Sequence, residues 1–283
     1  MSADHCHVPR IVVVITVAAI AACGVLMWGS LRYAWWRARI AESRPRVLMY
    51  HMIASSVPRA RFNKLRVDPK MFERQIRWLR DDGWTFVFVS DLLQSIQPKS
   101  VAITFDDGYL DNFTCADAIL EKYDAKATLY LVVDRYNRDW SAYKNPDRRD
   151  GELARENKLD DEHVRAMIES NRWELGAHTE THAYLPGLPF EAKRREIEGS
   201  KRKLAETFLV EVNSFAYPFG DYEREDVDLV RTVGFTSAVT TQPGIATDVS
   251  DERFEIRRIK VTGKDNMFVF RMRLRTGFRG VRG

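Results

Sequence analysis

The chain has 283 residues, enough for one large domain or two small ones, and its 45% hydrophobic and 30% charged residues make an ordinary globular composition. A net charge of +4 is too small to indicate a nucleic-acid partner by itself, and we expect none. Three widely spaced cysteines, Cys6, Cys23 and Cys115, argue against a disulfide framework or a zinc-knuckle motif.

The first predicted element is a membrane-spanning helix over residues 11–31. This run has 21 residues without a formal charge, and at ~1.5 Å rise per residue it just spans a bilayer core of roughly 30 Å. Trp35 and Trp36 follow it among arginines, a cluster typical of the lipid–water interface. A buried helix is one alternative, and a lipoprotein cleaved and lipidated at Cys23 is another. Apolar residues continue beyond Cys23, which favours an uncleaved anchor.

Strands and helices alternate after Pro45, and this alternation predicts a parallel α/β sheet or barrel. The first helix has Asp68 as its cap and Pro69 at its first position. The predicted strands are residues 47–50, 85–89, 101–105, 127–133, 173–176, 214–217, 237–240 and 256–261. The predicted helices are residues 69–82, 111–122, 160–170, 190–208 and 223–233.

Two adjacent carboxylates, Asp106 and Asp107, end an apolar strand and are followed by Gly108. Active sites of α/β folds lie at the carboxyl ends of strands. One acid could bind a metal while the other serves as a base. The alternative is a pair of acids in a turn before a helix.

Two histidines, His178 and His182, follow the strand at residues 173–176. At a spacing of four they would meet on one face of a helical turn and could hold one metal. Combined with a strand-end carboxylate they form a set that leaves positions open for water and substrate. Zinc is the default expectation, although such sites accept other divalent metals.

A third segment, residues 215–222, breaks a strand at Pro218 and Gly220. Such a break can expose a backbone N–H to a site, as an oxyanion donor requires. Taken alone, the segment is a turn.

Together and in this order, the three segments resemble the polysaccharide deacetylases of carbohydrate esterase family 4, the NodB homology domain. Residues 104–109 are similar to that family's first motif, TFDDG, and residues 178–182 to its second, H[ST]xxH. Residues 215–220 are similar to its third, which often reads RxPY. Residues 47–51 resemble the branch that deacetylates exported poly-N-acetylglucosamine. The resemblance covers roughly residues 47–262.

The resemblance implies a distorted (β/α) barrel of the NodB type, here preceded by one N-terminal transmembrane helix. It also implies a single divalent metal ion, most often zinc, held by Asp107, His178 and His182. Asp106 would be the general base that takes a proton from the attacking water.

The third motif departs from the family pattern. The backbone N–H of Phe219, beside Tyr217 and Pro218, would help to hold the oxyanion of the tetrahedral intermediate. The family's usual arginine, which orients the base, aligns with Ala216. Its usual tyrosine aligns with Phe219, which matters less if the N–H alone is used.

The family's late histidine, the usual general acid, is also missing, because residues 257–261 contain none and no histidine follows His182. His51 ends the first predicted strand, and we infer that it substitutes as the acid. The alternative is that His51 hydrogen-bonds the base or packs under a loop. His163 lies among acids in a helix and is expected at the surface.

We therefore predict a metal-dependent enzyme that releases acetate from an N-acetylhexosamine polysaccharide similar to poly-N-acetylglucosamine. One alternative is a catalytically weak carbohydrate-binding module, which would fit the missing arginine and histidine. Another is a metal-dependent amidohydrolase acting on a small substrate. The intact pairs of acids and histidines disfavour the first, and the membrane segment disfavours the second.

The predicted organisation is an N-terminal tail (1–10), an anchor (11–31), a linker (32–46), the deacetylase domain (47–265) and a basic C-terminal tail (266–283). An extracytoplasmic domain suits an exported polymer. The flanking arginines Arg32, Arg37 and Arg39 instead favour a cytoplasmic domain, although large domains translocate despite such charges.

The sequence also allows predictions for a long loop and for the C-terminal tail. Residues 135–158 form a long loop, whose aromatic residues Tyr136, Trp140 and Tyr143 would either stack on sugar rings or pack the loop down. The C-terminal tail has five arginines and no acid, and we expect a solvated end there.

Overall fold

The structure is a computed structural model, and it describes residues 10–94, 97–140 and 151–280. Cys6, Tyr143, residues 1–9 of the predicted N-terminal tail and residues 281–283 of the predicted C-terminal tail lie outside the described residues.

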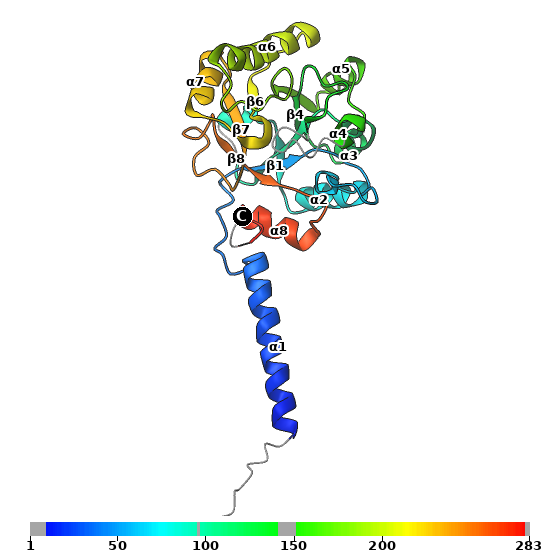
Figure 1. The fold of residues 1–283 in the computed structure, drawn as a ribbon, viewed down its shortest axis with the longest axis vertical. Helices are drawn as coiled ribbons and strands as arrows, with labels where there is room; N and C mark the ends of the chain where they lie inside the picture. Colours follow the sequence, from blue (N-terminus) through cyan, green and yellow to red (C-terminus); the bar gives the residue numbers. More distant parts are fainter. Residues whose placement is uncertain (1–9, 95–96, 141–150, 281–283) are drawn as a thin grey trace, which may run out of the picture.

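Seven parallel strands close into a barrel (Figure 1). Strand β1 pairs with β3 on one side and with β8 on the other, which closes the ring in the order β1-β3-β4-β5-β6-β7-β8. Strand β2 (Thr85–Val87) lies outside the ring, beside the first residues of β3. The predicted barrel is thus confirmed. The ring strands are β1 (Arg46–Tyr50), β3 (Ser100–Asp107), β4 (Ala127–Leu131), β5 (Trp173–Ala177), β6 (Ser214–Ala216), β7 (Ser237–Pro243) and β8 (Ile256–Lys260).

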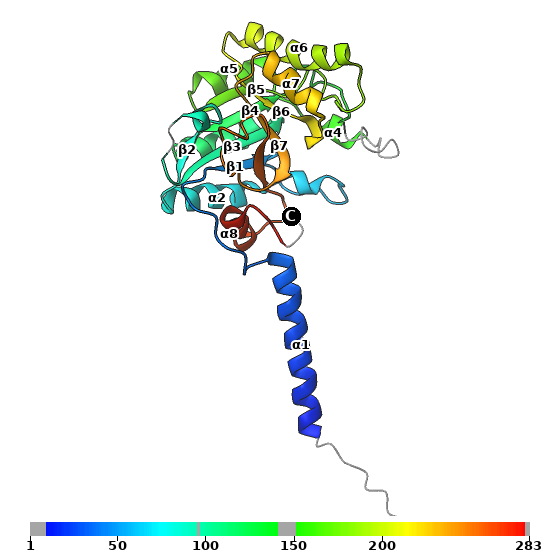
Figure 2. The same cartoon turned by 90° about the vertical axis from the view of Figure 1, so that its left-hand side faces the viewer.

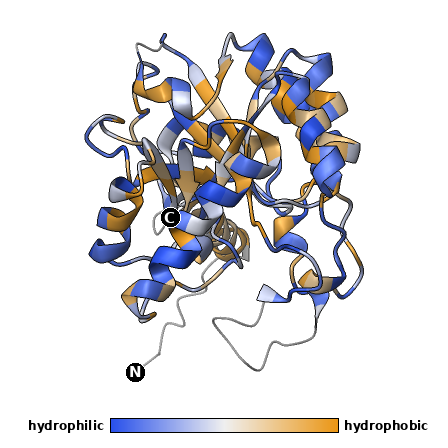
Figure 3. Ribbon diagram, turned by 90° about the horizontal axis from the view of Figure 1, so that it is seen from above, coloured by the Kyte–Doolittle hydropathy of each residue, from blue (hydrophilic) through white to orange (hydrophobic). Residues whose placement is uncertain are grey.

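Helices cover the outside of the barrel, with apolar faces turned toward the strands and polar faces outward (Figure 3). The Asp68 side chain caps α2 by accepting hydrogen bonds from the backbone N–H groups of Lys70 and Met71, as predicted. The predicted helix 111–122 begins with a π-helix at Asn112–Asp117. The α-helices of the domain are α2 (Pro69–Asp81), α3 (Ala118–Lys122), α4 (Glu152–Arg155), α5 (Asp161–Glu169), α6 (Phe190–Phe208), α7 (Arg224–Thr232) and α8 (Met267–Thr276).

Side chains alternate between the two faces of each strand, which produces an inner and an outer core. Leu48, Ile103 and Phe105 point outward and pack under the helices. Val47 and Ala102 belong to a second buried cluster that fills the barrel interior. Polar residues on the inner face near the strand ends therefore face the carboxyl mouth of the barrel.

Helix α1 (Arg10–Tyr33) projects away from the domain, with its side chains largely exposed (Figures 1 and 2). Among the described residues one helix, Ile11–Tyr33, has the length and composition to cross a membrane. Its last residue, Tyr33, packs edge-on against Phe268 of α8, with 5.4 Å between ring centroids.

The expectation of a solvated C-terminal end is wrong for α8. Asn266 caps this helix by accepting a hydrogen bond from the Val269 backbone N–H. Phe270 and Leu274 are buried in the core, so the apolar residues between the arginines fix this segment to the barrel.

Candidate active site

Asp106 and Asp107 end β3 at the carboxyl mouth of the barrel, and both are buried. Strict alternation would send the two carboxylates to opposite faces. The backbone leaves the extended conformation at Asp107, whose φ is +79°, and again at Gly108, whose φ is +82°. A Cβ on Gly108 would lie 2.4 Å from Leu131 Cδ1, so glycine is required for this turn.

The structure brings the three predicted metal ligands together. Asp107 Oδ1 lies 3.5 Å from His178 Nε2 and 3.3 Å from His182 Nε2. One ligand atom from each of the three buried residues falls within 4.8 Å of the others. Two imidazole nitrogens and one carboxylate oxygen suit a divalent ion such as zinc.

The predicted helical turn at residues 178–182 is wrong. These residues follow β5 (Trp173–Ala177) as an irregular loop, in which Thr179 and His182 have positive φ angles of 64° and 58°. The Thr179 hydroxyl accepts a hydrogen bond from the Ala183 N–H and holds the loop. The two histidines therefore converge through loop geometry rather than through helical spacing.

Hydrogen bonding and burial around the two histidines and Asp107 bear on their ability to bind a metal. His178 Nδ1 lies 2.7 Å from the Ala216 carbonyl oxygen, so donation of Nδ1–H to this oxygen leaves Nε2 free to bind a metal. Burial lowers the pKa of His182, although Asp107 opposes this effect. Burial alone would raise the pKa of Asp107, but hydrogen bonds from the two histidines hold it well below its usual value. A carboxylate whose pKa is lowered, with two imidazole nitrogens directed at it, suits a divalent ion.

An arginine that the sequence analysis did not identify holds Asp106. Arg258, on β8, is fully buried and donates 2.7 Å hydrogen bonds to both carboxylate oxygens of Asp106. It also donates to the Thr104 hydroxyl and the Thr240 carbonyl, which fixes its guanidinium plane. Burial would raise the pKa of Asp106, but the charge and hydrogen bonds of Arg258 lower it below its usual value.

Arg258 makes the contact with Asp106 that the family resemblance would assign to a third-motif arginine. That motif aligns Ala216 with the arginine, and Ala216 instead offers its carbonyl to His178. The signal in the sequence was the alternation of Ile256, Arg258 and Lys260, which places a charged side chain on the inner face of a buried strand. An unpaired arginine there would be costly, so a carboxylate partner could have been sought.

Replacing Arg258 with methionine should raise the pKa of Asp106. An opposite charge at this distance lowers a carboxylate pKa by about 1–3 units. In the wild type Asp106 therefore stays ionised to lower pH than in the variant. The acid limb of the variant's pH profile of kcat/KM should move to higher pH by about the same 1–3 units.

Two variants make this prediction about Arg258 specific. Arg258→Lys keeps the charge and should shift the limb less, and Arg257→Met removes an exposed arginine from the same strand and should not shift it. Because breaking a buried ion pair costs about 3–5 kcal/mol, the free energy of unfolding is measured alongside. An unshifted acid limb in folded Arg258→Met would contradict this role of Arg258.

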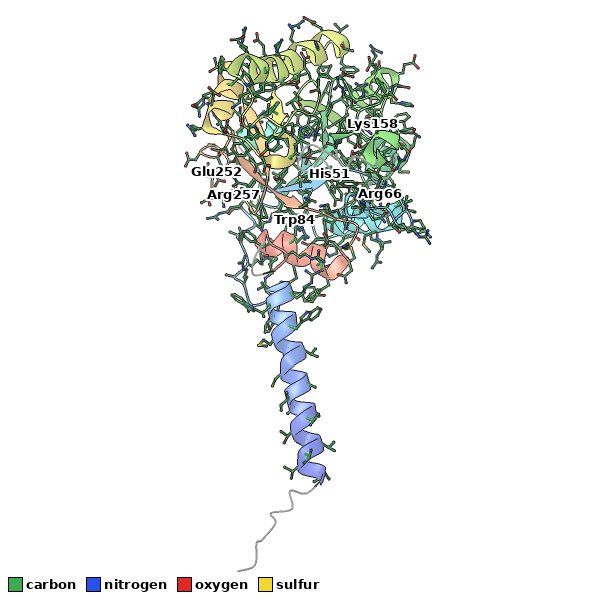
Figure 4. All side chains as sticks on the ribbon, viewed as in Figure 1. His51, Arg66, Trp84, Lys158, Glu252 and Arg257 are labelled. Atoms are coloured by element: carbon green, nitrogen blue, oxygen red, sulfur yellow. The ribbon has the colours of Figure 1, made fainter. Side chains whose placement is uncertain are left out.

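His51 lies one residue beyond β1 and lines the same cavity as the two acids (Figure 4). Its backbone carbonyl accepts a 2.8 Å hydrogen bond from the Asn112 amide, and the Ile53 N–H donates to Asp111 at 2.7 Å. These bonds fix the segment that carries the imidazole. Burial lowers the pKa of His51 below its usual value, and the charges of Asp107 and Asp106 oppose this effect only in part.

His163, expected at the surface, is partly exposed, and its ring accepts a hydrogen bond from the Asp160 N–H in the capping box of α5. The structure therefore places it outside the site.

The third motif forms a 3-10 turn, Pro218–Gly220, directly after β6. Phe219 has a positive φ of 59°, lines the cavity and lies edge-on to His182 at 4.5 Å. Tyr217 also lines the cavity, and its hydroxyl donates to the Phe254 carbonyl. Pro218 is buried and begins the turn. This turn therefore places Phe219 in the cavity lining, with its ring against His182.

The predicted loop at residues 135–158 contributes a wall of the cavity through Trp140 and Leu153. Trp140 is buried and stacks on His182 with 4.9 Å between centroids, which favours packing over sugar stacking for this residue. Tyr136 remains exposed. Lys158 donates to the Leu153 carbonyl and lies 5.0 Å from the Trp140 ring, so it ties the wall together from the side of α4 (Figure 4).

The cavity has a volume of about 260 Å³, near the lower end of the range for small-molecule sites, ~300–1,000 Å³. Asp106, Asp107 and the two histidines lie in its lining. Apolar side chains, among them Leu65, Trp140 and Leu153, form part of its wall. Lys64 and Lys260 also line the cavity.

Comparisons with known proteins agree on one family. Residues 94–238 match the family model described as polysaccharide deacetylase. The Bacillus subtilis (strain 168) protein YxkH, whose name places it among the polysaccharide deacetylases, is 29% identical over 222 residues, covering 76% of this chain and 71% of that protein.

A second curated relative is more distant. The poly-beta-1,6-N-acetyl-D-glucosamine N-deacetylase of Staphylococcus epidermidis is 23% identical over 209 residues, covering 69% of this chain and 68% of its own.

Among solved structures, a polysaccharide deacetylase from Bacillus cereus superposes with a TM-score of 0.68 at 27% identity, covering 82% of this chain and 69% of that one.

Proposed function

Because this chain belongs to the polysaccharide deacetylase family, we propose that it is a metal-dependent enzyme that hydrolyses N-acetyl groups of an N-acetylhexosamine polysaccharide. One observation carries the proposal: the buried group of Asp107, His178 and His182 lies beside a base, Asp106, that Arg258 keeps ionised. The Staphylococcus epidermidis relative is named as a poly-beta-1,6-N-acetyl-D-glucosamine N-deacetylase, which supports a polymer similar to poly-N-acetylglucosamine as the substrate.

We propose zinc as the ion, held by Asp107, His178 and His182. The buried carboxylate is ionised and the Nε2 atoms of both histidines face it, which suits the borderline-soft zinc ion. When bound, such an ion lowers the pKa of a water molecule and polarises the acetyl carbonyl.

The remaining chemistry is assigned to the chain itself. Asp106 takes a proton from the attacking water, and Arg258 orients its carboxylate for that task. The Phe219 backbone N–H helps to hold the developing oxyanion. An unprotonated amine is a poor leaving group, so His51 donates a proton to the sugar nitrogen.

Acetate release distinguishes this function from the two alternatives. The purified protein is given N-acetylglucosamine oligomers, an acetylated acidic polysaccharide and a set of small cyclic amides. A deacetylase releases acetate from at least one carbohydrate. A carbohydrate-binding module binds oligomers without releasing acetate, and a small-molecule amidohydrolase turns over the amides alone.

We propose further that α1 remains on the protein as a membrane anchor, with the domain outside the cytoplasm. Within the described residues the side chains of this apolar helix are exposed along most of its length, and Trp35 and Trp36 are exposed directly beyond it. The exported polymer proposed as substrate favours this orientation against the flanking arginines. Cys23 is exposed on α1, so lipidation there is the alternative to an intact helix.

Protease added to intact cells should digest the domain while a cytoplasmic marker protein survives. The expected cause is that α1 holds the domain on the outer side of the membrane. The measurement is the loss of full-length chain on an immunoblot, with detergent-permeabilised cells as control. A domain that is cut only after permeabilisation would show that the arginines determine orientation. A mature chain beginning at lipidated Cys23 would favour the lipoprotein.

A further inference from the structure

Two lysines line the catalytic cavity. Lys260 is the last residue of β8. It lies on the same inner face as Arg258, two residues closer to the mouth of the barrel. Lys64 lies in the 3-10 turn Asn63–Leu65 and lines the same cavity. Lys64 lies outside the three motifs, and Lys260 belongs to residues 257–261, the segment that lacks the family's late histidine.

The negative charges of the cavity are already engaged by other groups. Asp106 and Asp107 are the carboxylates in its lining. Arg258 takes both oxygens of Asp106, and Asp107 faces the two histidines. No ion pair within 4 Å joins Lys64 or Lys260 to another residue in the part of the chain that the structure describes. The cavity therefore carries two positive charges without a bound counter-charge.

The environment of Lys260 makes its charge costly. Burial lowers the pKa of its ammonium, and the charges of Lys64 and Arg258 lower it further, while Asp106 opposes them. A neutral ligand would leave this half-buried cation unpaired. An anionic group between the two lysines would gain charge-assisted hydrogen bonds from both.

We infer, resting on the proposed deacetylase function, that Lys64 and Lys260 form an anion subsite that selects N-acetylhexosamine units bearing or adjoining a negative charge. The shared chemistry is a carboxylate of an acidic sugar or a phosphate that substitutes or links the sugar. The same charges repel the ammonium group that each deacetylation creates. Neighbouring units that already carry a free amine should therefore be poor substrates.

The experiment compares three oligosaccharides that share an N-acetylglucosamine unit. One is neutral, one has a uronic acid next to the acetylated unit, and one has a phosphodiester there. The kcat/KM for acetate release is measured for the full chain with zinc and for Lys260→Met and Lys64→Met. Lys264→Met removes the same charge from an exposed position outside the cavity and serves as control.

The wild type should have a higher kcat/KM for one or both anionic substrates than for the neutral one. A preference for the uronic acid identifies a carboxylate as the recognised group, and a preference for the phosphodiester identifies a phosphate. Each pocket variant should reduce that preference by about 10-fold, chiefly through KM, because a hydrogen bond to a charged group is worth about a tenfold change or more. Lys260→Arg should restore it, and Lys264→Met should leave it intact.

If Lys260→Met and Lys64→Met changed kcat/KM equally for the neutral and the anionic substrates, the inference would be overturned. The lysines would then contact only sugar hydroxyls. A wild-type preference for the neutral oligosaccharide would overturn it too. Both outcomes leave the proposed deacetylase standing. If no carbohydrate releases acetate, the proposed function fails. Binding of the same oligosaccharides, measured by calorimetry, then tests the anion subsite without turnover, and equal affinities in wild type and Lys260→Met would contradict it.

Discussion

Replacing His178 with alanine should remove bound zinc from a folded protein and lower acetate release by more than about 100-fold. Loss of a residue that merely supports a metal ligand costs about 10–100-fold, so loss of a ligand should cost at least as much. The hydrogen bond from His178 to the Ala216 carbonyl disappears as well, but the barrel strands do not depend on it.

Metal content by elemental analysis, with circular dichroism for the fold, measures this effect. His163→Ala is the matched control, because His163 is a partly exposed histidine in the capping box of α5 and is not among the residues that line the cavity. That variant should keep its metal and its activity. Full zinc occupancy in His178→Ala would rule out the ligand assignment.

His51→Ala should keep its metal and lose about 10²–10⁴-fold in kcat on an N-acetylated sugar, the usual contribution of a general acid. His51 lines the cavity beside Asp106 and Asp107, and hydrogen bonds from its neighbours fix its backbone. The loss should be much smaller on an activated aryl acetate, because an aryloxide leaves without needing a proton.

Asp106→Asn provides the comparison for His51. Water must be deprotonated in both reactions, so this variant should slow both substrates together. If His51→Ala slows the aryl acetate as much as the amide, His51 serves the base or the fold, and another residue donates the proton.

The strands and most helices were predictable because their patterns are local. The continuous apolar run that gives β1 and the cap at Asp68 both act within a few residues. The grouping of Asp107, His178 and His182 was predictable from the motifs, because the carboxyl ends of parallel strands meet at the same end of the barrel.

Features that depend on barrel closure were not predictable in this way. Arg258 reaches Asp106 across 152 positions of sequence, and the pairing of β1 with both β3 and β8 creates that contact. The same closure brings Lys260 over the cavity, a residue that by sequence is one basic position in a strand. Trp140 reaches His182 from a loop without periodicity. Helix α8 was not predicted because arginines interrupt its sequence, although its apolar residues are buried in the structure.

The most direct test of the metal-dependent deacetylase is acetate release by the same preparation before and after removal of its metal. Chelator-treated protein should release no acetate from N-acetylglucosamine oligomers or from their acidic counterparts. Addition of about one zinc ion per chain should restore release, because one set of ligands is formed by Asp107, His178 and His182. Undiminished release from protein shown to be free of metal would contradict the proposed mechanism, as would an absence of acetate from fully loaded protein on every carbohydrate.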